Sequence, residues 1–145
     1  MRPYILSVAH KDDIVLYKKI RGAIQKLPDK IEFGEDENKK QIVLSCHILA
    51  RAVAKLFPVK LQDGYFLYHW QHSWVIGPKR NIIDVYPVAI LGGPIMVSGD
   101  FGSPCNMLYQ PIPTKVAYGN RFNRPSFQRA VRITVQHLKK VAQTD

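Results

Sequence analysis

Residues 44–88 decide the predicted fold, with the sequence LSCHILARAVAKLFPVKLQDGYFLYHWQHSWVIGPKRNIIDVYPV. Their first part repeats apolar residues at helical spacing, which predicts a helix that ends at Pro58. After Pro58 the period changes to two, and aromatic and β-branched residues become frequent, which predicts strands. The predicted strands cover residues 59–62, 64–69, 72–76 and 81–85, and Asp63-Gly64 and Gly77-Pro78 are turn or bulge signals between them.

The start of this helix has two alternatives. A start near Lys39 would place Cys46 in the middle of the helix, whereas a start at Ser45 would place it in the first turn. The second alternative matters chemically, because the free amide hydrogens and the dipole of a helix N-terminus favour a thiolate and lower the cysteine pKa.

On the N-terminal side, residues 3–8 are predicted as a short strand. A helix is predicted from Asp12, with Asp12 or Asp13 as its N-cap and Pro28 as its end. The polar and charged residues 28–40 are predicted as a loop.

On the C-terminal side, residues 86–120 are expected to supply edge strands and a lid, with short apolar pieces at Ile95–Val97 and at residues 107–109. A clear amphipathic helix is predicted from Ser126. Its apolar stripe is expected to pack on the sheet, and it consists of Phe127, Val131, Val135, Leu138 and Ala142.

Length and composition are those of an ordinary globular chain. With 145 residues, of which 46% are hydrophobic and 22% charged, the chain is predicted to form a single domain over residues 1–145. No apolar run approaches the roughly 20 residues that span a bilayer, and the start of the chain does not have the pattern of a signal peptide. We therefore expect a cytoplasmic protein, or one exported by a specialised secretion system.

The two cysteines, Cys46 and Cys105, are expected to be free thiols, since no export signal is seen. A disulfide between them would close a loop of about 60 residues and would consume the candidate nucleophile. His69 and His72 lack further ligands at a spacing typical of a zinc site. We therefore predict no structural metal and no cofactor.

The formal net charge is +10, and it is unevenly distributed. Residues 1–37 hold seven basic and seven acidic side chains, whereas residues 38–145 hold fourteen basic and four acidic ones. A basic surface favours nucleic acid, an anionic membrane or an acidic protein as a partner. A solvated basic surface without a dedicated partner is the alternative.

Cys46, His72 and Asp84 follow one another in an order that suits a nucleophile, a base and an orienting carboxylate. Pairing of Ile76 with Ile82 in a hairpin would place His72 and Asp84 on one face of the sheet, and a shift by one residue would separate them. In the first register Asp84 can fix the tautomer of His72, whose other ring nitrogen can then take the thiol proton. The triad hypothesis therefore requires this even register.

Each of these residues also has an ordinary structural explanation. Cys46 alone could be a small core residue, His72 a core histidine with its hydrogen bonds satisfied, and Asp84 a residue at a strand end or turn. Two other histidines are rival bases. On a helix, however, His47 points about 100° away from Cys46, and His69 lies outside the alternation that faces Asp84.

The surroundings of the proposed site can also be predicted. Trp74 shares the face of His72 and is expected to form a wall that excludes water. The backbone amide of Cys46 is a natural oxyanion donor if this residue starts the helix. Gln71, Gln62 or Trp74 could supply a second donor, and Trp74 and Gln71 are the predicted substrate-binding residues.

The stretch resembles the transglutaminase-like branch of the papain-like cysteine enzymes. The matching residues are Cys46, Ala50, Gly64-Tyr65, His72-Ser73-Trp74 and the sequence IDVYP at 83–87. The chain departs from the family where Ile76 replaces a frequent acidic residue, and where Val-Tyr separates Asp84 from the proline.

The resemblance implies an α+β fold, in which the helix that bears the nucleophile packs on an antiparallel sheet between N- and C-terminal helices. It also implies that Cys46 is the nucleophile, His72 the base and Asp84 the orienting residue. The expected function is a thiol-dependent hydrolase or acyltransferase that acts on an amide of a protein or peptide, either a peptide bond or a glutamine side chain, through a thioester.

The alternative is a binding module of the same fold without chemistry. Its basic surface would bind nucleic acid or an acidic partner. The exposed candidates for this role are Arg121, Arg124, Arg129, Arg132, Lys139 and Lys140.

Overall fold

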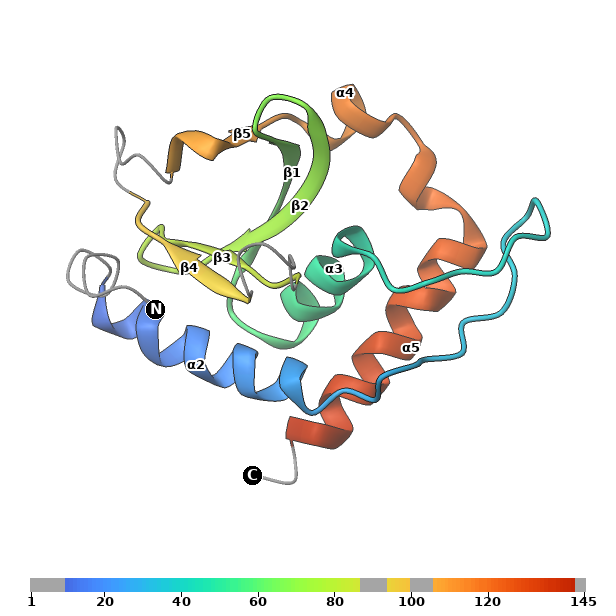
Figure 1. Ribbon diagram of the computed structural model, residues 1–145, viewed down its shortest axis with the longest axis horizontal. Helices are drawn as coiled ribbons and strands as arrows, with labels where there is room; N and C mark the ends of the chain where they lie inside the picture. Colours follow the sequence, from blue (N-terminus) through green and yellow to red (C-terminus); the bar gives the residue numbers. More distant parts are fainter. Residues whose placement is uncertain (1–9, 87–93, 100–105, 143–145) are drawn as a thin grey trace.

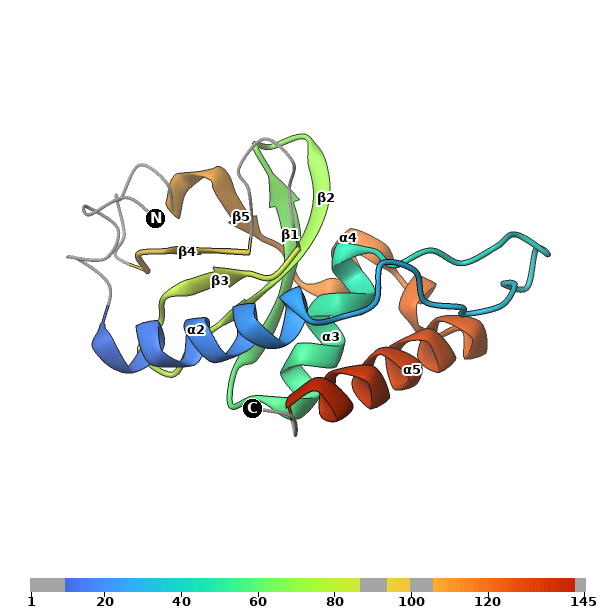
Figure 2. The same ribbon diagram turned by 60° about the horizontal axis from the view of Figure 1, so that its bottom comes forward.

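A computed structural model describes residues 10–86, 94–99 and 106–142 of the chain. In this part, five antiparallel strands form one curled sheet in the order β4-β3-β2-β1-β5 (Figures 1 and 2). The strands are β1 (Lys60–Phe66), β2 (Trp70–Ile76), β3 (Ile82–Asp84), β4 (Ile95–Val97) and β5 (Tyr109–Pro111). The fold of the described residues is therefore α+β, and the strand predicted over residues 3–8 lies outside them.

The helices are α2 (Lys11–Gln25), α3 (Cys46–Leu56), α4 (Thr114–Tyr118) and α5 (Pro125–Ala142), with short 3₁₀ helices η1 (Asn106–Leu108) and η2 (Arg121–Asn123). α3 packs against β1 and β2 on one side and against α5 on the other (Figure 1). None of the described helices is both long enough and apolar enough to span a bilayer.

The packing of α5 corrects a prediction. Its apolar stripe was expected to pack on the sheet, but α5 packs mainly on α3, which lies between them. The reason is that α3 is apolar around most of its circumference, so it needs cover on two sides. Within this packing, Leu138 of α5 joins the core cluster of Leu49 and Val53, and Val131 joins that of Ile48.

β1 is one continuous strand with regular pairing to β2, although a turn or a bulge was predicted at Asp63-Gly64. Gly64 lies within the strand, opposite His72 of β2 and Pro111 of β5. A Cβ at this position would lie 2.0 Å from the backbone oxygen of Gln110 and 2.9 Å from the Trp74 ring. The glycine therefore marks a close approach of β5 and Trp74 to β1 and not a turn.

The first helix begins one residue before its predicted start, and its N-cap is His10, whose ring accepts a hydrogen bond from the amide of Asp12. Asp13 is fully buried and has another role. Its carboxylate accepts hydrogen bonds from the amides of Lys79 and Asn81 and from the side chain of Asn81. This residue thereby ties α2 to the turn between β2 and β3.

Candidate active site

Cys46 is the first residue of α3 and carries a free thiol. Ser45 has an extended backbone and is the N-cap, with its Oγ accepting a hydrogen bond from the amide of Ile48 at 3.3 Å. Of the two predicted starts, the structure has the one that places Cys46 in the first turn. The thiol therefore lies among the free amide hydrogens of a helix N-terminus, where a thiolate is stabilised.

His72 and Asp84 meet in the predicted register. Ile76 pairs with Ile82, and the His72 Nε2 atom lies 2.8 Å from the Asp84 Oδ2 atom. Both side chains are buried. Because Nε2 faces the carboxylate, Nδ1 is the ring nitrogen that remains for the hydrogen bond between His72 and Cys46.

Tyr109 of β5 adds a second donor to Asp84. Its hydroxyl donates to the same Oδ2 atom at 2.7 Å. The rings of the buried residues Trp74 and Tyr109 lie 6.0 and 6.2 Å from that of His72, measured between centroids, and the ring of the half-buried Phe66 lies 5.7 Å away. Buried aromatic side chains thus keep water from the pair of His72 and Asp84 and fix the orientation of the imidazole.

A second hydrogen-bond network reaches the start of α3 through His47. The Nδ1 atom of His47 lies 2.7 Å from the Oγ of Ser73, which donates to the carboxylate of Asp63. Arg51 binds both oxygens of that carboxylate, at 3.1 and 2.7 Å, and Thr114 also donates to it. We refer to His47, Ser73, Asp63 and Arg51 as the buried relay.

The donors and acceptors of the buried relay follow from the charge of Asp63. Burial raises the pKa of Asp63, but hydrogen bonds from Arg51, Ser73 and Thr114 outweigh burial and lower it. An ionised carboxylate can only accept, so the single hydroxyl proton of Ser73 points at Asp63. Ser73 then accepts from His47, which fixes a proton on Nδ1 of that ring.

Aromatic rings hold the buried relay from the side of α4 and η2. The rings of Tyr118 and Phe122 lie 5.0 and 4.9 Å from that of His47. The guanidinium carbon of Arg51 lies 4.1 Å from the centre of the Phe122 ring, a distance typical of a cation–π contact. His47 follows Cys46 on α3, and its ring is turned to Ser73 of β2, but it still lowers the pKa of the Cys46 thiol.

The two histidines determine the charge of the thiol. Burial raises the pKa of Cys46, but hydrogen bonds with His47 and His72 and the charge on both rings outweigh burial and lower it to about 6. Burial lowers the pKa of His72, but its hydrogen bonds with Asp84 and Cys46 outweigh this effect and raise it to about 9. At pH 7 Cys46 and His72 therefore form a thiolate–imidazolium pair.

The predicted substrate-binding residues differ in their positions. Gln71 is exposed, and its Oε1 accepts a hydrogen bond from Arg121 at 3.0 Å. Trp74 is only 1% exposed and forms the wall beside His72. The side chain of Gln62 donates to the backbone oxygen of Asp63 at 2.8 Å. His69 is exposed at the turn between β1 and β2, away from Asp84.

Tyr109 and Asp63 were not predicted as parts of the site. Tyr109 lies within the stretch 86–120, where the sequence has no regular apolar period. Asp63 was interpreted as a turn residue because Gly64 follows it. The sequence signal that could have found Asp63 is the alternation of side chains along β1, which places Asp63 on the same face of the sheet as Leu61 and Tyr65. Cys105, the other cysteine, lies outside the described residues.

Among the residues that the structure describes, no group of three or more histidine, cysteine, aspartate or glutamate side chains could hold a metal ion. Comparison of the chain with protein-family models, curated proteins and solved structures finds no match in any of the three.

Proposed function

We propose that the chain is a thiol-dependent hydrolase or acyltransferase that acts on an amide bond of a protein or peptide. The observation that carries this proposal is the buried pair of His72 and Asp84, 2.8 Å apart, on the sheet against which the helix that begins with Cys46 packs. The papain-like, transglutaminase-like fold is part of the proposal. It is supported by a helix that begins with the cysteine and packs on the strand that bears the histidine.

In the proposed reaction, the Cys46 thiolate attacks the carbonyl carbon of the amide and forms a C–S bond. The electron pair of the carbonyl moves to its oxygen, which the backbone amide of Cys46 stabilises. The imidazolium of His72 then gives its proton to the nitrogen, the C–N bond breaks, and an amine leaves. The product at this stage is a thioester on Cys46.

In the second half, His72 takes a proton from water or from an acceptor amine, which attacks the thioester. The C–S bond breaks, the Cys46 thiolate returns, and the product is a carboxylic acid or a new amide. Asp84 and Tyr109 keep the imidazole in place during both halves, and Asp84 stabilises its charged form.

The direct test uses a peptide mixture from a protease-digested cell extract, with and without an added primary amine. Mass spectrometry separates a hydrolysed peptide bond, a glutamine converted to glutamate, and an amine joined to a glutamine. We expect one of these products with the wild-type chain and none with Cys46→Ser. If Cys46→Ser forms the same products, or if the wild-type chain forms none, the proposal is wrong.

The nucleic-acid alternative stays a prediction. Two of its candidate residues already have partners within the chain. Arg129 donates to the backbone oxygens of Phe33 and Glu35 at 3.1 and 2.7 Å, and Arg121 donates to Gln71. The Arg129 contacts join α5 to the loop before α3, and the Arg121 contact joins η2 to β2.

A further inference from the structure

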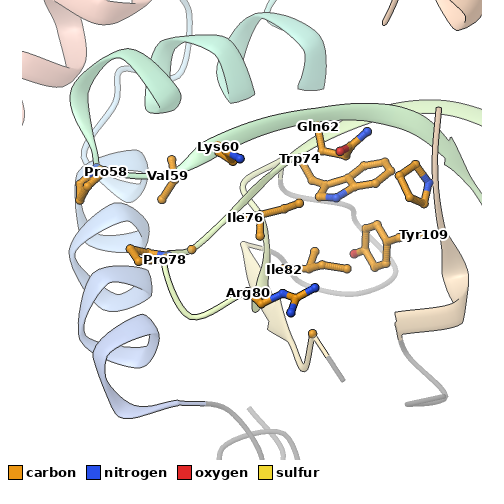
Figure 3. A pocket seen from close by; sticks show the side chains of 13 residues that line it. Pro58, Val59, Lys60, Gln62, Trp74, Ile76, Pro78, Arg80, Ile82 and Tyr109 are labelled. Carbon is orange, nitrogen blue, oxygen red and sulfur yellow. The ribbon is translucent and has the colours of Figure 1, made fainter. Parts of the chain in front are cut away.

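Residues of β1, β2, β3 and the turn between β2 and β3 line a cavity of about 710 Å³ (Figure 3). It lies beside the candidate active site, on the same face of the sheet as His72. The facing follows from the alternation in β2, because His72, Trp74 and Ile76 point to one side. Trp74 separates the candidate active site from the cavity, since its ring stacks beside His72 and also lines the cavity. A strand rises about 3.3 Å per residue, so the interval from His72 to Ile76 is about 13 Å.

The cavity has an apolar floor and a positive charge. Trp74, Ile76, Ile82 and Tyr109 form the floor. The charged residues that line it are Lys60 and Arg80, and no acidic residue lines it among the described residues. Within that part of the chain, neither of the two cationic side chains forms an ion pair.

The backbone holds Arg80 in a fixed position. Its φ of 73° lies in the left-handed region, which glycine favours and arginine rarely adopts. On either side, the amides of Lys79 and Asn81 are bound by the buried carboxylate of Asp13. A Cβ on Gly99 would lie 1.7 Å from the backbone oxygen of Arg80, so that oxygen packs directly on the glycine.

This conformation sends the guanidinium towards Ile82 and Tyr109, over the cavity (Figure 3). A charged side chain held by an unfavourable backbone conformation, without an ion-pair partner in the described chain, fits a role in binding. Arginine binds carboxylates with two parallel hydrogen bonds, and an apolar floor suits the aliphatic part of the same ligand.

We propose that this cavity binds an acidic side chain of the protein or peptide substrate, with the carboxylate on Arg80 and the charge of Lys60 adding to the attraction across the cavity. The assignment rests on the proposed function, because it places the acidic residue relative to the amide that Cys46 attacks. An extended peptide advances at about the rise of a strand, so the acidic residue lies about three or four positions from that amide. Two cations beside an apolar floor suit a single carboxylate better than a row of phosphates.

Binding is measured by fluorescence anisotropy with a labelled peptide rich in glutamate, and with the same peptide carrying glutamine instead. The protein is the full chain with Cys46→Ser, so that the probe is not consumed. Arg80→Gly removes the guanidinium and places the residue that favours a positive φ at this position, so the fold is preserved. We expect it to weaken binding of the glutamate peptide about tenfold or more, because charge-assisted hydrogen bonds are lost.

Lys79→Met is the matched control, because it removes one positive charge from the neighbouring residue, which does not line the cavity. We expect it to change binding of the glutamate peptide less than twofold, as Lys79 lacks direct contact with the ligand. Lys60→Met should weaken binding as Arg80→Gly does. Equal binding of the two peptides, or an equal loss in Lys79→Met, would overturn the assignment. A single-stranded oligonucleotide that displaces the peptide from the wild-type cavity but not from Arg80→Gly would also overturn it.

The test is independent of catalysis. A loss of glutamate-peptide binding in Arg80→Gly supports the assignment of the cavity as a binding site for an acidic side chain. If Cys46 then forms no product, only the proposed function fails. If products form but Arg80→Gly leaves their preference for acidic residues unchanged, the function stands and the cavity assignment is wrong.

Discussion

Adjacent residues of β2 act on the start of α3 through different networks. His72 bonds Cys46 and Asp84, and Ser73 bonds His47 and Asp63 on the other face of the strand. Because side chains alternate along a strand, one dipeptide supplies both networks. The position of the thiol is therefore tied to β2 from two directions.

The first prediction concerns the pH dependence of Cys46, measured in a Cys105→Ser background so that one thiol remains. The rate of alkylation by iodoacetamide should rise as pH increases through about 6, where the thiol becomes a thiolate, and then stay level. Turnover should rise through the same pH but fall above about 9, where His72 loses the proton that the leaving amine needs. In His72→Gln the alkylation midpoint should move up towards the ordinary thiol value near 9. An unchanged midpoint would contradict the pairing of His72 with the thiol.

The second prediction concerns His47. His47→Gln keeps a side-chain donor for Ser73 but removes the imidazole, so the pKa of Cys46 should rise above its value of about 6. The measurement is the same alkylation profile in the Cys105→Ser background. His69→Gln serves as the control, since this exposed histidine lies away from the site and its loss should leave the midpoint in place. Equal profiles for the two variants would mean that the buried relay has only a structural role.

At the scale of elements, the pairing of β1 with β5 brings the Tyr109 hydroxyl within hydrogen-bond distance of Asp84. Gly64 permits this contact, because a Cβ would lie 2.0 Å from the oxygen of Gln110. Gly64→Ala should therefore destabilise the fold by about 1–3 kcal/mol, as an overpacked interior does, and should displace Tyr109. Urea unfolding measures the loss.

The control for this prediction is Gly22→Ala in α2. A Cβ at Gly22 meets nothing within 4 Å, so alanine should stabilise the helix by about 0.5–1 kcal/mol. A change of glycine to alanine is thus expected to lower the free energy of unfolding at Gly64 and to raise it at Gly22. If both variants lose stability equally, the loss in Gly64→Ala is not caused by the close approach of β5 to β1.

Much of the site could be predicted from residue types, and the remainder depended on packing. The register of His72 and Asp84 is the one that the triad hypothesis required, and the start of α3 at Cys46 is one of the two alternatives that the sequence left open. The role of His47 could not be predicted in the same way. A helical wheel gives its direction on α3, but the partner Ser73 is placed by the packing of α3 on β2.

The sheet edges were equally difficult to predict. The strand at Ile95–Val97 was expected and is present as β4. By contrast, residues 107–109 were expected to be extended, whereas the structure divides them between η1 and the start of β5. β5 pairs with β1 through a close approach of the two backbones at Gly64. No apolar pattern in the sequence indicates that approach.

At the scale of the whole molecule, Asp13 connects α2 to a turn 66 to 68 residues later. Asp13→Ala would remove the acceptor of the Lys79 amide and of the buried amide and side chain of Asn81, so the free energy of unfolding should fall by about 3 kcal/mol. The exposed neighbour Asp12 is the control, and Asp12→Ala should cost only about 0.5 kcal/mol. Urea unfolding of both variants measures the difference. Similar losses would mean that the helix N-terminus, and not the link to the turn, is what Asp13 stabilises.

The position of α3 between the sheet and α5 has a consequence for motion. Beyond its first turn, whose amides have no partner within the helix, a helix enclosed on two sides can expose its amides to solvent only when one of its covering layers separates. Deuterium should therefore enter α3 at a rate set by unfolding of the whole chain, while the outer helix α2 exchanges sooner. Protease treatment under native conditions should leave the thiol reactive until the chain itself unfolds. The lifetime of the reactive cysteine would then equal the lifetime of the fold.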